Sequence, residues 1–212
     1  MKDTIMRILV IGATGTLGRN VVKALQDHHA KHGEGTLEIL GASRTSTTYP
    51  VDCHDDASVR SLFDRVGSVD AVVSTIGGAK WASAAEAELE TYQSTLAGKL
   101  LCQLRLALAA RGHVRSGGSI TLTSGIVGHH VFHGGSPSAI ANLGLDAFVK
   151  SASAELPDLR LNTVSATVLE ESADAYASVF PGFQPVPGAV AAAAFVRSVY
   201  GVETGQTLKA WT

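Results

Sequence analysis

Short apolar runs and segments of helical spacing alternate along the whole chain. The runs are of strand length and rich in Val, Ile and Leu, and the segments between them repeat apolar residues every three or four positions. The runs predict strands at about 6–11, 37–42, 49–51, 71–75, 119–123, 160–165 and 207–210. The segments predict helices at about 16–31, 56–66, 83–111, 138–155, 172–179 and 188–200, of which the third is one long helix or two consecutive ones.

This alternation predicts an α/β fold. A strand, a helix and another strand form a right-handed crossover between parallel strands, so that helices cover both faces of one sheet. We therefore expect a doubly wound, Rossmann-type sheet of seven mainly parallel strands, in a single domain over residues 1–212 with a small lid at about 168–187. In such a sheet the ligand binds at the carboxyl ends of the strands.

The turn after the first predicted strand carries glycines in a pattern typical of dinucleotide sites. Gly12, Gly15 and Gly18 separate an apolar strand from a helix. One glycine permits the tight turn, one lets the backbone approach a pyrophosphate, and one lets the helix pack close to the strand. The helix start offers free N–H groups and a positive dipole end to the phosphates. The predicted cofactor-binding residues, from this turn and later strand ends, are Gly12, Thr14, Gly15, Thr16, Leu17, Gly18, Ser43, Arg44, Asp52, Thr75, Gly77 and Gly78.

The end of the second predicted strand indicates which dinucleotide is bound. An NAD site usually presents an acid there for the ribose 2′-hydroxyl, whereas an arginine suits a 2′-phosphate. Arg44 occupies this position, with Ser43 as a neutral donor, so the sequence favours NADP(H) over a solvated loop arginine. Asp52 can accept from the adenine amino group, or it caps the next helix, a role that Asp55 or Asp56 can also fill.

Composition narrows the function classes. A net charge of −2 without a lysine/arginine cluster provides no field for nucleic acid. Cys53 and Cys102 are too few for a disulfide framework and lack the spacing of metal ligands, so we expect a reduced compartment and no metal. The first apolar run is broken by Arg7 and is too short for a signal or a membrane span. We expect a cytoplasmic protein with no membrane partner.

Several segments together resemble the short-chain dehydrogenase/reductase family, over about residues 6–210. The matching features are the glycine turn, Val51-Asp52-Cys53-His54-Asp55, Val69-Asp70-Ala71-Val72-Val73 leading to Gly77, Gly118-Ser119-Ile120-Thr121-Leu122-Thr123-Ser124-Gly125, Phe148-Val149-Lys150, Glu155-Leu156 and Arg160-Leu161-Asn162-Thr163-Val164. Thr95 corresponds to the asparagine that the family often places in the preceding helix. The glycine spacing is closer to the extended and atypical branches of the family.

The resemblance fails at the acid–base residues. In this family a serine at the end of the fifth strand orients the substrate oxygen, a tyrosine about thirteen residues later exchanges its proton, and a lysine four residues beyond lowers the pKa of that tyrosine and holds the ribose. Ser124 fills the serine position. The tyrosine and lysine positions hold Pro137 and Ala141, or in the other register Ser138 and Asn142. The chain thus resembles the family in its nucleotide half and lacks the usual tyrosine and lysine.

Other residues must then supply the proton that hydride transfer to a carbonyl requires. His129, His130 and His133 lie in the loop after the fifth strand, and histidine titrates near neutrality. Tyr176 lies in the segment that the family uses as a lid over the nicotinamide. We take Ser124, His133 and Tyr176 as the catalytic candidates; the alternatives are exposed loop histidines and a packing tyrosine.

The sequence thus predicts an NADP(H)-dependent oxidoreductase that acts on a carbonyl or alcohol of a small molecule with a non-standard proton donor. Two alternatives remain: a non-redox isomerase, dehydratase or cyclase, and a catalytically inactive NADPH-binding regulatory protein. The helices about 92–111 and 138–155 are the pair through which the family usually dimerises, so we expect a homodimer or homotetramer. An apolar stripe that fits either core or interface consists of Leu100, Leu101, Leu104 and Leu108.

Overall fold

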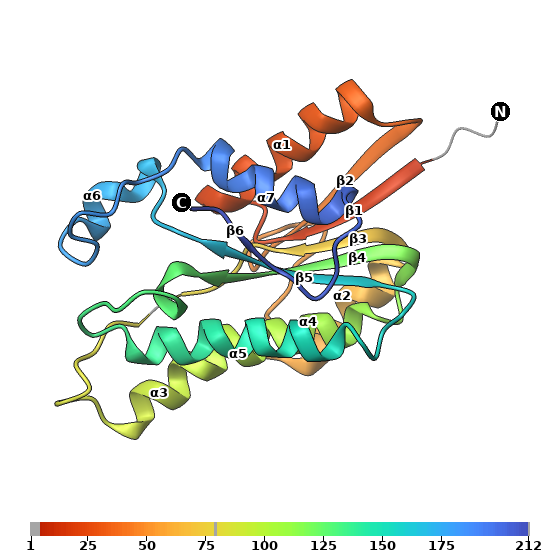
Figure 1. Ribbon diagram of the computed structural model, residues 1–212. Coiled ribbons are helices and arrows are strands. Elements are labelled where there is room, and N and C mark those ends of the chain that lie inside the picture. Colours follow the sequence, from red (N-terminus) through yellow and green to blue (C-terminus); the bar gives the residue numbers. More distant parts are fainter. Residues whose placement is uncertain (1–4, 79, 212) are drawn as a thin grey trace.

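The computed structural model describes residues 5–78 and 80–211 and forms a three-layer α/β structure (Figure 1). Its six-stranded parallel sheet has the order β2-β1-β3-β4-β5-β6. The strands are β1 (Ile5–Ile11), β2 (Thr36–Ala42), β3 (Val69–Ser74), β4 (Val114–Gly125), β5 (Arg160–Ala166) and β6 (Thr207–Lys209). The order reverses between β1 and β3, which is where ligands bind in doubly wound sheets.

Helices cover both faces of this sheet. They are α1 (Thr16–His32), α2 (Asp56–Val66), α3 (Leu89–Thr95), the π-helix η1 (Leu96–Leu101), α4 (Cys102–Ala110), the 3₁₀-helix η2 (Ile126–Gly128), α5 (Ser136–Ala152), the 3₁₀-helix η3 (Glu170–Ser172), α6 (Ala173–Tyr176) and α7 (Gly188–Tyr200). In Figure 1, α1 and α7 lie above the sheet, and α2, α4 and α5 lie below it. Within the described ranges, no helix is both long and apolar enough to cross a membrane.

Burial on both faces explains the unbroken apolar runs in the strands. Along β1, Leu9 and Ile11 belong to the core shared with α2, α4 and α5, whereas Ile8 and Val10 belong to the core shared with α1 and α7. Alternating side chains therefore enter opposite layers, and neither face of the strand is left for polar residues.

The expectation of seven strands was wrong. The segment 49–51 forms only an isolated bridge between Ser43 and Pro50. The backbone N–H of Ser43 donates to the Tyr49 carbonyl and that of Val51 to the Ser43 carbonyl. Turns at 43–46 and 52–55, closed by bonds from the Ser46 and Asp55 N–H groups, leave no room for a longer ladder. The chain then turns at Asp55, which caps α2 by accepting from the N–H groups of Ala57 and Ser58.

The predicted long helix over 83–111 is shorter and irregular. It begins at Leu89 as α3, passes through a π-helical turn at Leu96–Leu101 and continues as α4 to Ala110. Near the carboxyl terminus, the predicted lid helix divides into η3 and the single turn of α6. Both departures lie at the carboxyl edge of the sheet.

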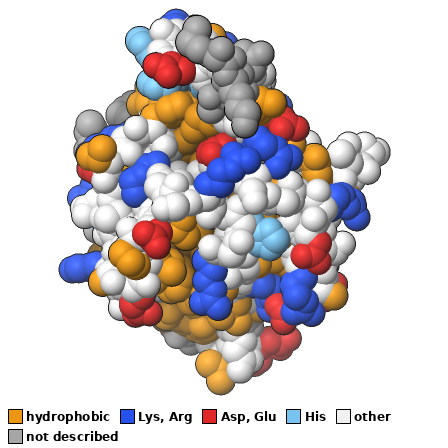
Figure 2. Space-filling view, turned by 90° about the vertical axis from the view of Figure 1, so that its right-hand side faces the viewer, with side chains coloured by type: hydrophobic (Ala, Val, Ile, Leu, Met, Phe, Trp, Pro, Cys, Tyr) orange, Lys and Arg blue, Asp and Glu red, His pale blue; other side chains and the backbone are white. Residues whose placement is uncertain are grey.

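The two edges of the sheet differ. The amino ends of the strands present basic and acidic side chains interspersed with one another (Figure 2). Two ion pairs of this edge join Arg7 to Glu38 and Arg115 to Asp70, each at 2.7 Å. The carboxyl ends of β1, β3 and β4 instead lead into glycine-rich turns, and the cavities described below lie there.

Candidate active site

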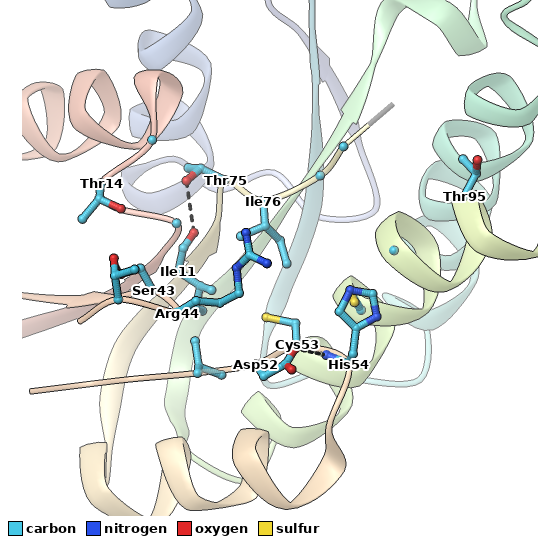
Figure 3. A pocket seen from close by; sticks show the side chains of 18 of the residues that line it. Ile11, Thr14, Ser43, Arg44, Asp52, Cys53, His54, Thr75, Ile76 and Thr95 are labelled. Atoms are coloured by element: carbon cyan, nitrogen blue, oxygen red, sulfur yellow. Dashed lines mark hydrogen bonds between the residues drawn. The ribbon is translucent and has the colours of Figure 1, made fainter. Parts of the chain in front are cut away.

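The turn after β1 is held against the turn after β3. Gly12 has a φ of +87°, and a Cβ at this position would lie 2.7 Å from Thr75 Oγ1. The Thr75 hydroxyl donates to the carbonyl oxygen of Ile11 at 3.1 Å, and the Thr75 N–H donates to the same oxygen at 2.8 Å (Figure 3). Only glycine fits at position 12, both for its backbone conformation and for lack of space.

The start of α1 provides a place for an anion. A Cβ on Gly18 would overlap the carbonyl oxygen of Gly12, so this glycine lets the helix approach the turn. Gly15 at the N-cap provides no capping side chain, and the first turn holds no acidic residue. The N–H groups of this turn and the positive end of the helix dipole therefore remain available to a phosphate.

A cavity of about 580 Å³ extends from this turn past the end of β2. Arg44 reaches from the end of β2 into the cavity toward Ile76 (Figure 3). Asp52 also lines it and accepts from the His54 N–H at 2.9 Å. Because Asp55 caps α2, the carboxylate of Asp52 is not needed for that role. Burial raises the pKa of the Cys53 thiol to about 12, so the thiol is a neutral part of the wall.

A second cavity of about 400 Å³ adjoins the first. The two share lining residues in the turn after β3, namely Thr75, Ile76, Gly77 and Gly78. The second cavity is enclosed by the carboxyl ends of β4 and β5, the starts of α1 and α5, and α6. A ligand that begins at Arg44 and crosses Gly77 therefore ends in the second cavity.

Three buried polar atoms in the wall of the second cavity have no hydrogen-bond partner among the described residues. They are Ser124 Oγ, Asn142 Oδ1 and Trp81 Nε1. Ser124 and Asn142 are each only 2% exposed, so this lack of partners is costly unless a ligand provides them. Their position favours a polar ligand group between β4 and α5.

Lys99 enters the same cavity from the π-helix η1. This residue is only 6% exposed. Its aliphatic part runs beside Gly77, where a Cβ would lie 3.3 Å from Lys99 Cε. Burial lowers the pKa of the Lys99 amine to about 8, and the carboxylate of Asp146 on α5 partly opposes this shift.

Aromatic side chains form the outer wall of the second cavity. The ring of Trp81 meets that of Phe180 edge to face at 5.7 Å, and Phe180 lies 6.2 Å from Tyr176 on α6. Phe132 packs against Phe180 at 4.6 Å. These contacts fix the lid segment over the cavity with an apolar surface.

The structure separates the predicted catalytic candidates. Ser124 and Tyr176 both line the second cavity. His133 is exposed and is not among the described residues that line the second cavity. His129 instead pairs with Asp146 at 3.2 Å, and His130 packs against Trp211 with ring centroids 5.1 Å apart.

The predicted cofactor residues lie together around the two cavities. The first is lined by Gly12, Thr14, Gly15, Ser43, Arg44 and Asp52, the second by Thr16 and Leu17, and both by Thr75, Gly77 and Gly78. Gly18 lies behind them, against the carbonyl of Gly12. In the part of the chain that the structure describes, no group of three or more His, Cys, Asp or Glu residues is arranged to hold a metal.

Sequence reasoning missed Lys99, Asn142 and Trp81 as site residues. A lysine within an otherwise apolar helical segment was a usable signal for Lys99, but the helical register could not show that a π-helical turn directs it into the cavity. Asn142 was considered only as the residue at the usual lysine position.

Comparisons with known proteins agree with this fold. The family described as enoyl-(acyl carrier protein) reductase matches residues 15–204. The protein lin1944 from Listeria innocua is 39% identical, with a TM-score of 0.87 over 96% of this chain and 98% of that one. A small-chain dehydrogenase in complex with NADPH has 23% identity and a TM-score of 0.83, over 97% and 96% of the two chains.

A short chain dehydrogenase from Burkholderia cenocepacia in complex with NADP has 21% identity and a TM-score of 0.78, over 96% and 95% of the two chains. At such identities these two structures show the shared fold. No curated protein matches the chain significantly.

Proposed function

The chain belongs to the short-chain dehydrogenase/reductase family, and on this premise we propose that it is an NADP(H)-dependent oxidoreductase that interconverts a carbonyl and an alcohol on a small molecule. The first cavity would hold the adenosine and pyrophosphate of the nucleotide, and the second would hold the nicotinamide and the substrate. The shared turn at Thr75–Gly78 connects the two halves.

The residues of the first cavity fit a phosphorylated dinucleotide. At Gly12 and Gly18, any Cβ would collide with neighbouring atoms, so only glycine lets the turn and the helix lie this close together. The uncapped start of α1 can present N–H groups to the pyrophosphate. Arg44 can bind a 2′-phosphate, since no acid lies at the end of β2 to favour the 2′-hydroxyl of NAD. Two proteins of the same fold were solved with NADPH or NADP, which supports this assignment.

The unpartnered hydroxyl of Ser124 is the observation that carries the redox proposal. It is buried, it lies at the carboxyl end of β4, and it faces the cavity next to the nucleotide site. The bound nicotinamide supplies or accepts a hydride. Ser124 donates to the substrate oxygen and orients the carbonyl, and the apolar walls exclude water.

The proton must come from outside the usual tyrosine–lysine pair of α5. Ser138, in the tyrosine register, already donates its hydroxyl to the Lys80 carbonyl at 2.9 Å. Asn142, in the lysine register, is neutral and cannot act as an acid. The aromatic lid of Trp81, Tyr176 and Phe180 favours a substrate whose surface beyond the carbonyl is apolar.

A two-stage assay tests this function. NADPH binding is measured first by fluorescence titration, and NADPH consumption is then followed against a panel of apolar aldehydes, ketones and α,β-unsaturated ketones. We expect tight binding and consumption with at least one class, and Ser124→Ala should reduce turnover on the order of 10²-fold with little change in NADPH affinity. Binding without consumption favours a regulatory NADPH-binding protein. Turnover without net NADPH oxidation favours an isomerase, dehydratase or cyclase.

A further inference from the structure

We propose that Lys99 is the proton donor of this site: its ammonium group protonates the substrate oxygen as the carbonyl is reduced. This inference rests on the proposed function. It assigns to a residue of the π-helix η1 the task that the family gives to a tyrosine on α5.

The path of the Lys99 side chain supports this role. The residue is almost fully buried, yet it lines the second cavity. Its stem passes Gly77, which lines both cavities. The ammonium group is thus brought to the junction between the proposed nucleotide site and the proposed substrate site.

Three polar groups from three elements meet in this cavity. Lys99 comes from η1, Ser124 from the end of β4 and Asn142 from α5. Ser124 Oγ and Asn142 Oδ1 are buried without partners, and both can hydrogen-bond to a ligand or to the lysine ammonium. A substrate oxygen bound between them would be accessible to one charged donor, Lys99, among the described lining residues.

The other candidate donors fit less well. The phenol of Tyr176 belongs to a residue that is 40% exposed and packed in the lid. The hydroxyl of Ser138 donates to a backbone carbonyl. His129 pairs with Asp146, and His130 packs against Trp211. His133 is not among the described residues that line the second cavity.

The surroundings of Lys99 make it a suitable acid. Burial lowers the pKa of its amine to about 8, which is much closer to neutrality than that of a free lysine. Asp146 on α5 is the charged group whose field reaches Lys99, and it is itself held by Thr163 and His129. Among the other elements that line the cavity, α6 presents Tyr176, and the end of β4 presents the Ser124 hydroxyl.

A hydride leaves NADPH and forms the new C–H bond at the carbonyl carbon, while the carbonyl π electrons move to oxygen. The N–H bond of the Lys99 ammonium breaks as the O–H bond of the alcohol forms. The products are the alcohol, NADP⁺ and a neutral lysine, which regains its proton from solvent. The oxidation of an alcohol reverses each movement, with neutral Lys99 as the base.

Two substitutions separate proton donation from charge. Lys99→Met keeps the approximate length and removes the proton, whereas Lys99→Arg keeps the charge but holds its proton too tightly to donate it. We expect both to lower kcat on the order of 10²-fold or more, with NADPH affinity within a few fold of the wild type. The control is Lys23→Met, at a surface lysine paired with Asp27, and it should match the wild type.

A second readout does not depend on turnover. The pH dependence of acetylation at each lysine, measured by mass spectrometry, reports when each amine loses its proton. We expect Lys99 to become reactive near pH 8, below the range of a free lysine, and NADPH to protect it. The kcat profile of the wild type should show the same inflection, and this inflection should be absent in Lys99→Met.

Each outcome is decisive. If the wild type reduces carbonyls and Lys99→Met does so equally well, the inference is wrong and the proposed function stands. Retained turnover in Lys99→Arg would also overturn the inference, as would a rise in KM alone in Lys99→Met. The same holds if the pH inflection is lost in Tyr176→Phe or His133→Asn and kept in Lys99→Met. If the wild type binds NADPH but reduces nothing, the proposed function fails and the inference fails with it.

Discussion

Lys99 Cε would lie 3.3 Å from a Cβ placed on Gly77, so that the buried lysine passes directly beside the turn that joins the two cavities. Gly77 has a φ of +145°, a conformation that side chains rarely adopt. The absence of a side chain there leaves room both for the lysine stem and for a ligand crossing the turn. The pairing links the end of β3 to the π-helical turn of η1.

Burial of Lys99 should reduce the stability of the fold. A pKa lowered to about 8 means that the charged amine is disfavoured in the folded state, at a cost of about 3 kcal/mol. This cost is fully present below about pH 8, and it falls as the pH rises toward the pKa of an unfolded lysine. Lys99→Met should therefore raise the free energy of unfolding near pH 7, and the gain should shrink near pH 9.5.

Urea denaturation of both proteins at these two pH values measures the effect. Lys23→Met provides the control, since Lys23 lies exposed on α1 and its substitution should change stability little at either pH. Equal stability of Lys99→Met and the wild type near pH 7 would mean that the buried amine is already neutral or well solvated.

Arg44 should determine the choice of nucleotide. A charged contact to a 2′-phosphate readily supplies the roughly 1.4 kcal/mol that a tenfold preference requires. We expect NADPH to bind at least tenfold more tightly than NADH, and Arg44→Ala to remove most of this preference by weakening NADPH. Fluorescence titration of both nucleotides measures it, with Arg60→Ala on the exposed face of α2 as the matched control. A preference that survives Arg44→Ala would exclude this residue as the phosphate ligand.

Gly18 should be intolerant of any side chain. A Cβ there overlaps the Gly12 carbonyl, which is backbone and cannot move without opening the turn. Gly18→Ala should therefore lower the midpoint of thermal unfolding and weaken NADPH binding at least tenfold. Gly112→Ala is the control, because a Cβ at position 112 meets nothing within 4 Å. Normal NADPH affinity in Gly18→Ala would contradict the proposed path of the pyrophosphate.

The lining of the first cavity could be predicted because its residues belong to motifs that are local in sequence. The glycine turn, Arg44 and the strand ends follow directly from short motifs, and the sheet then brings them to one edge. The layered α/β fold was also evident from the alternation of apolar runs and helical segments. The prediction of a seventh strand was wrong because the propensity of 49–51 did not show that turns on both sides limit this segment to a single bridge.

The lining of the second cavity depends on distant contacts that short motifs do not encode. Thr95 matches the family's asparagine position, yet the residue that enters the cavity is Lys99, one turn later, because the helix widens into a π-helical turn. Likewise, Tyr176 could be assigned to the lid from its position, but its exposure depends on how α6 packs against Phe180.

The exposed apolar side chains of α5 and of the η1–α4 segment should support self-association. Leu101, Leu108, Ile140 and Leu143 are between 45% and 50% exposed. Such residues on neighbouring helices favour a symmetric interface between copies. Light scattering at tens of micromolar should show a dimer or tetramer, and Leu108→Glu combined with Ile140→Glu should reduce it to a monomer. A wild type that is monomeric at this concentration would contradict the prediction.

Transfer of deuterium from NADPH labelled at C4 to a carbonyl substrate is a direct test of the proposed hydride transfer. Both C4 positions are labelled in separate samples, and the alcohol formed from a responsive aldehyde or ketone is analysed by mass spectrometry. We expect deuterium at the carbinol carbon from one labelled form only, because the second cavity would hold the substrate on one side of the proposed nucleotide site. NADPH that binds tightly but transfers no deuterium to any carbonyl in the panel would contradict it.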